Sequence, residues 1–303
     1  MSSLHWPRLS IITPSFNQAQ FLEATLRSVL DQGYPNLEYI VIDGGSTDGS
    51  VEIIRRYADR LAYWVSEKDN GQSDAINKGL ACASGEIVAW LNSDDTYLPG
   101  AFEAQVGYLC AHPEVDVVYG DCVYTDAGGA ALYTALGRPF SLVDLLKFTI
   151  PRQPTVFLRR AAIERGGGLD HTFQYAMDAE YWLRLHVTGV RFAYNPKTIA
   201  TYRLHGSSKT VAGVRQMHLE CERLIERYAP EAERPKLLAD ARLQTAMRLA
   251  EQGQWRESWR YVVSAGVLRP RLLAYAAVAL ERFTGLPVYR APLAWWMRRK
   301  QRG

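Results

Sequence analysis

Apolar residues in the first 120 positions follow two alternating patterns. Short β-branched runs predict buried strands, at residues 9–13, 37–42, 61–65, 86–91 and 115–119. Between these runs, apolar residues recur every three or four positions and predict helices, at 21–30, 51–58 and 73–83. Pro99 suits the first position of a further helix. Alternating strands and helices with short links predict a mostly parallel α/β sheet flanked by helices.

The alternation stops after Gly120. Turn residues at 126–129 predict a hairpin, and a mixed region with a strand at 198–202 continues to about residue 209. Beyond residue 211 the apolar periodicity is helical, and helices are predicted at 217–228, 232–252, 255–265 and 272–283. We therefore expect an α/β domain over residues 1–210 and a C-terminal helical region over residues 211–303.

Polar residues follow each of the first four predicted strands. These strand-end loops are residues 13–17, 43–50, 66–75 and 92–95. Open α/β sheets bind ligands in the crevice beyond the carboxyl ends of their strands, so the four loops predict one binding site. The fourth is the most informative, because a buried apolar run ends abruptly in Asn92, Ser93, Asp94 and Asp95. Hard oxygen ligands of this kind suit Mg²⁺ or Mn²⁺, which in turn suit a diphosphate.

Composition narrows the class of protein. The 303 residues are 48% hydrophobic and 22% charged, with a net charge of +3, which is ordinary for a globular protein and too weak to indicate nucleic-acid binding. No signal-peptide pattern and no apolar run of membrane-spanning length occurs, so a cytoplasmic protein is expected. The four cysteines lack metal-ligand spacing and are predicted to be buried, reduced thiols.

Other nucleotide and metal sites do not match these loops. A dinucleotide-binding turn needs three spaced glycines after the first strand, where this chain has Pro14 and Phe16. A calcium loop beginning at Asp43 would need an acid at its twelfth position, which is Ile54.

An ordered set of motifs resembles glycosyltransferase family 2. It comprises residues 11–17 (IITPSFN), 41–49 (VIDGGSTDG), 74–79 (DAINKG), 91–95 (LNSDD), 151–154 (PRQP), 177–184 (MDAEYWLR) and 202–205 (YRLH). The resemblance covers about residues 8 to 210. It implies the GT-A fold and inverting, usually metal-dependent transfer of a sugar from a nucleotide donor. Membrane spans and the Gln-x-x-Arg-Trp motif of the processive synthases are missing from the sequence, so transfer of a single sugar is expected.

The resemblance also implies the donor-binding residues. They are Thr13, Pro14, Ser15, Asn17, Asp43, Gly44, Gly45, Asp74, Lys78, Asn92 and Ser93. Asp43 would accept a hydrogen bond from the base, and capping of the glycine turn that follows it is the alternative. Asp74 suits a helix N-cap as well as a ligand contact, and Lys78 suits solvent as well as a phosphate.

The resemblance places the metal and the base on three residues. Asp94 would bind Mn²⁺ or Mg²⁺ with help from His205, which could instead be structural. Asn92 departs from the family, whose fullest motif has an acid at that position. Asp178 would be the catalytic base that takes the proton of the acceptor hydroxyl, with Glu180 as the fallback and a surface acid as the alternative for both. Met177 replaces the glutamate that usually precedes this base.

The acceptor side is less defined by the sequence. Gln153, Glu180 and Trp182 are the candidate residues there. The expected partners are a UDP-sugar and a glycan or lipid-linked acceptor of bacterial-type cell-surface polysaccharide synthesis, without nucleic acid. A non-catalytic nucleotide-sugar-binding or scaffold protein is the alternative.

The C-terminal tail suggests a peripheral site on the inner face of the membrane. Apolar residues at 293–297 precede the basic residues 298–300, as in an interfacial anchor for anionic lipid. Packing of the same tryptophans on the α/β domain is the alternative.

Overall fold

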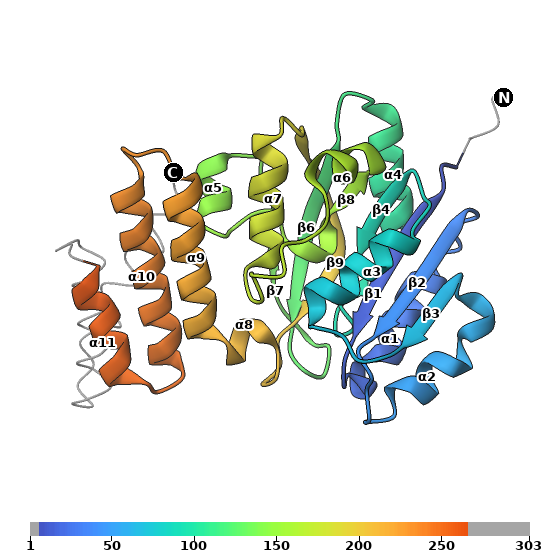
Figure 1. The fold of residues 1–303 in the computed structure, drawn as a ribbon, viewed down its shortest axis with the longest axis horizontal. Coiled ribbons are helices and arrows are strands. Elements are labelled where there is room, and N and C mark those ends of the chain that lie inside the picture. The colour runs from blue at the N-terminus through green and yellow to red at the C-terminus, as the bar shows by residue number, and fades with distance from the viewer. Residues whose placement is uncertain (1–5, 266–303) are drawn as a thin grey trace. The chain divides into compact units, whose positions relative to one another are not determined.

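The computed structural model describes residues 6–265 of the chain (Figure 1). Its contacts divide the chain into two compact units, Met1–Gly213 and Val214–Gly303. The predicted helix at 272–283 and the basic tail lie outside the described residues.

Parallel strands form the first half of the sheet, as the sequence pattern predicts. The strands are β1 (Leu9–Ser15), β2 (Leu37–Asp43), β3 (Tyr63–Ser66) and β4 (Ile87–Trp90), in the order β3-β2-β1-β4. The intervening helices are α1 (Ala19–Leu30), α2 (Ser50–Arg56) and α3 (Gln72–Cys82), with a 3₁₀ turn, η1, at Ala58–Arg60. Because these strands are parallel, their carboxyl ends meet at one edge of the sheet.

The second half of the sheet is mixed. Its elements are β5 (Thr96–Tyr97), α4 (Ala101–Ala111), β6 (Val117–Thr125), β7 (Ala131–Ala135), α5 (Leu142–Leu146), η2 (Gln153–Thr155), β8 (Phe157–Arg159), α6 (Arg160–Gly166), α7 (Met177–Val187), β9 (Phe192–Arg203) and α8 (Lys209–Ala212). Strand β8 is antiparallel to β4 and to β6, whereas β9 runs parallel to β6. The predicted hairpin is β6–β7, and the strand predicted at 198–202 is the end of the longer β9.

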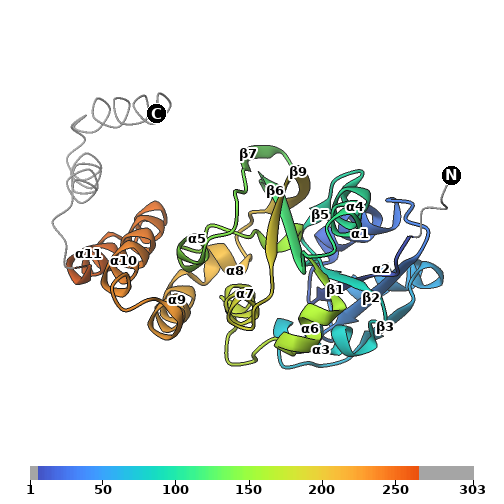
Figure 2. The same ribbon diagram turned by 90° about the horizontal axis from the view of Figure 1, so that it is seen from above.

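Helices cover both faces of the sheet. Helices α1 and α4 lie on one face and α3 and α6 on the other (Figure 2). On the first face, Leu9 and Ile11 pack with Leu22 and Leu26 of α1, and all four side chains are fully buried. Since both faces are covered, the strands read as continuous apolar runs instead of alternating ones.

Helix α3 approaches β1 closely at Gly79. A Cβ atom at this position would overlap Cγ2 of Ile12, which is fully buried in β1. We expect Gly79→Ala to lower the free energy of unfolding by about 1–3 kcal/mol, because the added methyl overpacks a filled interface. Urea denaturation measures the change.

Gly107 is the matched control, since it lies inside α4 with no atom near the position of a Cβ. There the same substitution should stabilise the protein by about 0.5–1 kcal/mol, the difference in helix propensity between alanine and glycine. Equal effects at the two glycines would contradict the packing argument.

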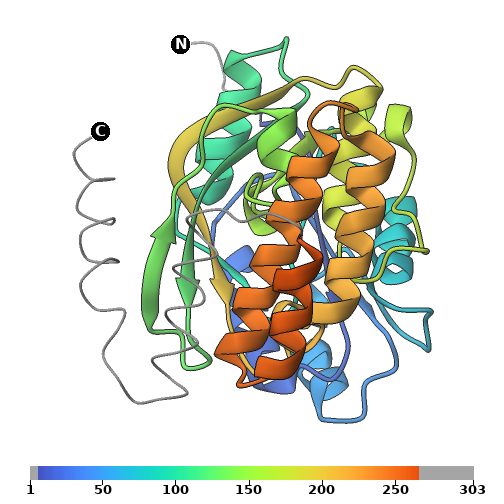
Figure 3. The same ribbon diagram turned by 90° about the vertical axis from the view of Figure 1, so that its left-hand side faces the viewer.

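The described residues of the second unit, 214–265, form three helices. These are α9 (Val214–Tyr228), α10 (Arg234–Glu251) and α11 (Trp255–Ser264), close to the predicted bounds, and α10 packs against both of the others (Figure 3). A buried polar pair joins α9 to α10, with Thr245 Oγ1 2.9 Å from Nδ1 of His218. Among the helices of residues 6–265, none combines the length and apolar character needed to cross a bilayer.

The prediction of buried cysteines is half wrong. All four thiols are free, but only Cys122 and Cys221 are buried, whereas Cys82 and Cys110 are exposed. Both exposed residues lie at or near the C-terminal ends of helices, α3 and α4, where apolar neighbours in sequence do not decide which face meets solvent. Burial raises the pKa of the Cys122 thiol and keeps it protonated.

Candidate active site

The four polar loops converge on one cavity of about 860 Å³ at the carboxyl ends of β1, β2 and β4. The start of α7 and the segment after β9 complete its walls. The predicted residues that line it are Pro14, Ser15, Asn17, Gly44, Gly45, Asn92, Ser93, Asp94, Gln153 and Asp178. The other predicted residues, Thr13, Asp43, Asp74, Lys78, Glu180, Trp182 and His205, lie behind or beside it.

The loop after β1 presents a polar wall. Ser15 Oγ is buried in this wall and has no hydrogen-bond partner among the described residues. Asn17 adopts a left-handed backbone conformation with φ of 51°, which asparagine takes more readily than most residues other than glycine. Its side-chain oxygen accepts from the backbone N–H of Thr47 at 2.9 Å, so the loops after β1 and β2 are tied together.

Asp43 and Thr13 support this wall from below. Asp43 is fully buried, and its carboxylate accepts from the backbone N–H groups of Gly45 and Ser46 at 3.1 and 2.9 Å and from the Ser66 hydroxyl at 2.7 Å. The two backbone hydrogen bonds cap the turn that follows Asp43, which is the alternative role considered for this residue from the sequence. Thr13 is also fully buried, with Oγ1 2.9 Å from the Tyr39 hydroxyl.

Asp69 is a cavity residue that the sequence did not single out. Its Oδ2 lies 2.8 Å from the place that a Cβ of Gly44 would take, and its Oδ1 accepts from the Gly71 N–H at 2.9 Å. Gly44 therefore leaves the space into which this carboxylate extends. Asp69 sits in an irregular loop with several polar neighbours, and no periodicity indicates which of them faces the cavity.

Asp74 and Lys78 contact neighbouring residues of the chain beside the cavity. Asp74, in the first turn of α3, accepts from the backbone N–H of Asn70 at 3.0 Å. Lys78 Nζ pairs with Glu67 at 2.8 Å, and this contact raises the pKa of the lysine. Neither residue lines the cavity.

The end of β4 brings together an acid and a histidine that are 111 residues apart in sequence. His205 Nε2 lies 2.9 Å from Asp94 Oδ2, and His205 Nδ1 lies 3.0 Å from the Ser207 hydroxyl. The Phe21 ring packs on the imidazole with 4.6 Å between ring centres. Asp94 lines the cavity, whereas His205 is buried beside it and contacts the Asp94 carboxylate from the protein interior.

The neighbouring acids and amides hold this loop in place. Asp95 is buried and accepts from the backbone N–H of Arg203 at 2.9 Å, so it joins β4 to the end of β9. Burial and the adjacent Asp94 raise the pKa of Asp95. The side-chain oxygen of Asn92 accepts from Gln72 Nε2 at 2.6 Å.

The donor set fits a divalent cation that is shared with a ligand. Across residues 6–265, no group of three or more histidine, cysteine or acidic side chains could hold a metal. Asp94 and His205 together offer one hard oxygen and one imidazole nitrogen. Mg²⁺ and Mn²⁺ commonly bind through one or two carboxylates and complete their coordination with phosphate oxygens and water.

Asp178 lines the same cavity from the first turn of α7. Its Oδ1 accepts from the backbone N–H of Ala179 at 2.8 Å. Burial raises the pKa of this carboxyl, and the backbone hydrogen bonds and the charges of Lys209 and Arg152 offset the effect only in part. A carboxylate with a raised pKa is a better proton acceptor than an ordinary surface aspartate.

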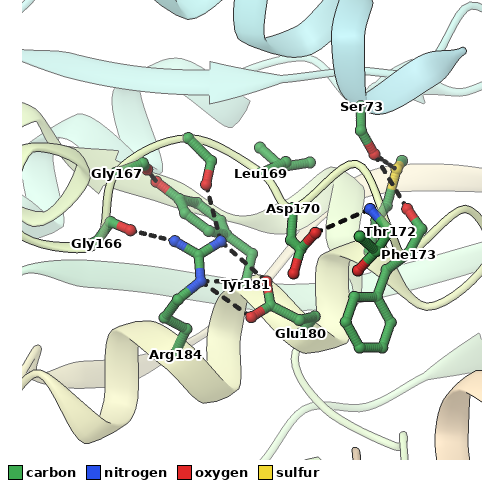
Figure 4. A network of polar contacts seen from close by, with 12 residues as sticks. Ser73, Gly166, Gly167, Leu169, Asp170, Thr172, Phe173, Glu180, Tyr181 and Arg184 are labelled. Atoms are coloured by element: carbon green, nitrogen blue, oxygen red, sulfur yellow. Dashed lines mark hydrogen bonds and ion pairs between the residues drawn. The ribbon is translucent and has the colours of Figure 1, made fainter. Parts of the chain in front are cut away.

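Glu180 and Trp182, expected near the acceptor, instead lie buried behind the cavity. Glu180 is 1% exposed and pairs with Arg184 at 2.9 Å, and Arg184 also donates to the carbonyls of Gly166 and Gly168 (Figure 4). Trp182 stacks on Trp90 with 5.1 Å between ring centres. Helix α7 thus places Asp178 at the cavity and these two residues in the core.

Gln153 lines the cavity and is 5% exposed. Its Nε2 donates to the Trp90 carbonyl at 2.8 Å, which fixes the side chain to β4. Its Oε1 is buried and has no partner within the described chain.

A cavity lined by acidic side chains beyond the carboxyl ends of parallel strands is typical of nucleotide-binding α/β proteins. Comparison with known proteins gives the family. Residues 10–161 match the model of glycosyl transferase family 2, and the chain belongs to this family. The putative teichuronic acid biosynthesis glycosyltransferase TuaG of Bacillus subtilis is 32% identical over 67% of this chain and 81% of its own length. An uncharacterized glycosyltransferase of Mycobacterium tuberculosis is 35% identical over 59% of this chain and 68% of its own.

Solved structures show the same fold, which is that of the GT-A glycosyltransferases. TarS residues 1–349 of S. aureus, in complex with UDP-GlcNAc, matches with a TM-score of 0.62 and 19% identity over 90% of this chain and 85% of that one. The mannosyltransferase PcManGT of Pyrobaculum calidifontis, in complex with GDP-Man and Mn²⁺, also matches with a TM-score of 0.62, at 24% identity over 93% and 82%. The predicted family and fold class are thereby confirmed.

Proposed function

We propose that this protein is an inverting, metal-dependent glycosyltransferase that moves one sugar from a UDP-sugar to a hydroxyl of a glycan or lipid-linked acceptor. The observation that carries the proposal is the placement of Asp94 and Asp178 in one cavity, on different walls. The name of TuaG, a relative, supports a role in synthesis of a cell-surface polysaccharide. UDP-GlcNAc and GDP-Man in complexes of the same fold support a nucleotide-sugar donor.

The reaction is a single displacement at the anomeric carbon. Asp178 takes the proton of the acceptor hydroxyl as the new carbon–oxygen bond forms, and the bond from the anomeric carbon to the diphosphate breaks with its electron pair on the phosphate oxygen. One base on the face opposite the leaving group gives inversion. A divalent cation bound by Asp94 with His205 would supply positive charge to the leaving diphosphate.

The loops after β1, β2 and β3 hold the nucleotide in this proposal. Ser15, Asn17 and Asp69 line the cavity there, and Gly44 and Gly45 allow close approach of the backbone. We propose a cytoplasmic location with contact to the inner face of the membrane, where lipid-linked acceptors would be met.

Thermal denaturation with UDP, GDP and dTDP, each with and without Mn²⁺, tests the donor site. A ligand that binds the folded state raises the melting temperature, and at one hundred times its Kd the stabilisation is about 2.7 kcal/mol. UDP with Mn²⁺ should therefore give the largest shift, because it is the proposed ligand of the donor site and should bind most tightly. A larger shift with GDP or dTDP would change the assigned carrier. If no nucleotide shifts the melting temperature, the proposed donor site is wrong.

A further inference from the structure

Two consecutive residues beside the cavity each leave a buried polar atom without a partner. Arg152 Nε and Gln153 Oε1 are both buried and make no hydrogen bond within the described chain. An unsatisfied buried polar atom costs about 1–3 kcal/mol, so native structures usually pair such atoms. One of these atoms is a donor on a cation and the other is an acceptor, as a ligand with an anionic group and a hydroxyl would require.

The charge of Arg152 is also unpaired. No carboxylate of residues 6–265 lies within ion-pair distance of its guanidinium, which makes one long hydrogen bond, from Nη1 to the Phe148 carbonyl at 3.5 Å. Burial raises the pKa of Asp178, and the charge of Arg152 offsets a part of that rise. Arg152 directly precedes Gln153, which lines the same cavity as Asp178.

A tyrosine ladder holds Arg152 in this place. The Arg152 guanidinium lies 5.6 Å from the centre of the Tyr124 ring. Tyr124 is stacked between Tyr133 at 4.7 Å and Tyr202 at 4.9 Å. Tyr202 lines the cavity, and Tyr133 is 54% exposed on β7, so the ladder runs from the cavity wall to the surface. Two other arginines have orphaned nitrogens, but Arg160 starts α6 and Arg234 belongs to the second unit.

We propose that Arg152 binds an anionic group of the acceptor, either the carboxylate of an acidic sugar or a phosphate, while Gln153 Oε1 accepts from an acceptor hydroxyl. Arginine suits both groups, because its planar fork of N–H donors matches carboxylate and phosphate oxygens. This inference rests on the proposed function, and it names the class of acceptor that the same site takes.

The test compares neutral and anionic probes on the full chain. The donor site is first saturated with UDP and Mn²⁺, and the melting temperature confirms that UDP is bound. Methyl β-D-glucoside, methyl β-D-glucuronide and glucose 1-phosphate are then titrated, with binding followed by NMR. At least one anionic probe should bind about tenfold tighter than the glucoside, the difference expected of one charge-assisted hydrogen bond. The stronger of the two anionic probes identifies the group.

Variants of Arg152 locate the effect. Arg152→Gln should abolish the anionic preference and leave the UDP shift unchanged, and Arg152→Lys should restore part of the preference. Arg165→Gln is the matched control, since Arg165 pairs with Asp116 at 2.7 Å at the opposite end of the sheet from the cavity. That variant should keep the wild-type preference.

Three outcomes would overturn the inference. They are equal binding of neutral and anionic probes, no binding of either anionic probe, and a preference that survives in Arg152→Gln. A UDP shift that disappears in Arg152→Gln would place Arg152 on the donor, which also overturns it. Failure of the proposed function looks different, because the wild-type protein would then show no UDP shift at all.

Discussion

Asp178→Asn is expected to lower the rate of sugar transfer by about 10²–10⁴-fold, the usual contribution of a general base. The amide keeps the shape of the side chain but cannot take the proton of the acceptor hydroxyl. Because Asp178 belongs to α7 and not to the loops after β1, β2 and β4, the variant should retain the UDP and Mn²⁺ shift in melting temperature. Nucleotide release in the presence of donor and acceptor measures the rate.

Glu180→Gln is the matched control for this variant. Glu180 is buried and paired with Arg184, so the substitution should lower the melting temperature while the folded protein keeps its rate of transfer. The opposite result, with Glu180→Gln inactive and Asp178→Asn active, would move the base to Glu180 and require the start of α7 to turn.

The pH profile gives a second test of the same assignment. Burial raises the pKa of Asp178, so the base becomes protonated at a higher pH than an ordinary aspartate. The rate should therefore fall on the acidic side at a pH above the usual range of aspartate. The linked stability has the opposite sign: the raised pKa favours folding at low pH, and that contribution is lost as the pH rises through the folded-state value. An acidic limb at the ordinary aspartate pKa would count against Asp178.

The sheet and the place of the site follow from local sequence patterns. Parallel strands that end in polar loops put those loops at one edge whatever the details of packing, so the sequence predicts the convergence of the loops after β1, β2 and β4. The resemblance to the family supplies the pairing of Asp94 with His205, which no local pattern could predict across 111 residues. It also separates Asp178 from Glu180, although both lie in one turn of α7.

Which residues of these loops face the ligand depends on the orientation of each side chain, and local sequence patterns do not show it. Asp69 enters the cavity because Gly44 leaves room for it, a relation between two loops that neither loop shows alone. Asp43 accepts from the backbone N–H groups of the turn that follows it, and Lys78 of α3 pairs with Glu67 in the preceding loop. Both partners lie near in sequence, so these contacts form without any ligand. Single-residue motifs thus predict the location of the site better than they predict which of its side chains face the ligand.

Asp94→Asn is expected to remove the Mn²⁺-dependent part of the UDP shift and to lower the rate of transfer by about a hundredfold or more, since a bound metal contributes several kcal/mol to a transition state of this charge. Asp94 provides the anionic oxygen among the two proposed metal ligands, Asp94 and His205. Asn92 is neutral, and its side-chain oxygen already accepts a hydrogen bond from Gln72. A neutral amide at position 94 would leave His205 as the one strong ligand. UDP alone should still bind through the loops after β1, β2 and β3.

The control is Asp126→Asn, which makes the same chemical change in the β6–β7 turn, outside the cavity. It should leave the Mn²⁺ dependence of both the UDP shift and the rate as in the wild-type protein, because asparagine can also accept from the Ala130 N–H in that turn. If Asp94→Asn keeps full Mn²⁺ dependence, the cation is bound elsewhere and the contact with His205 serves only to hold the loop. If the wild-type rate is unchanged by chelation, the leaving diphosphate is stabilised without a metal, and arginine and lysine side chains near the cavity become the candidates for that charge.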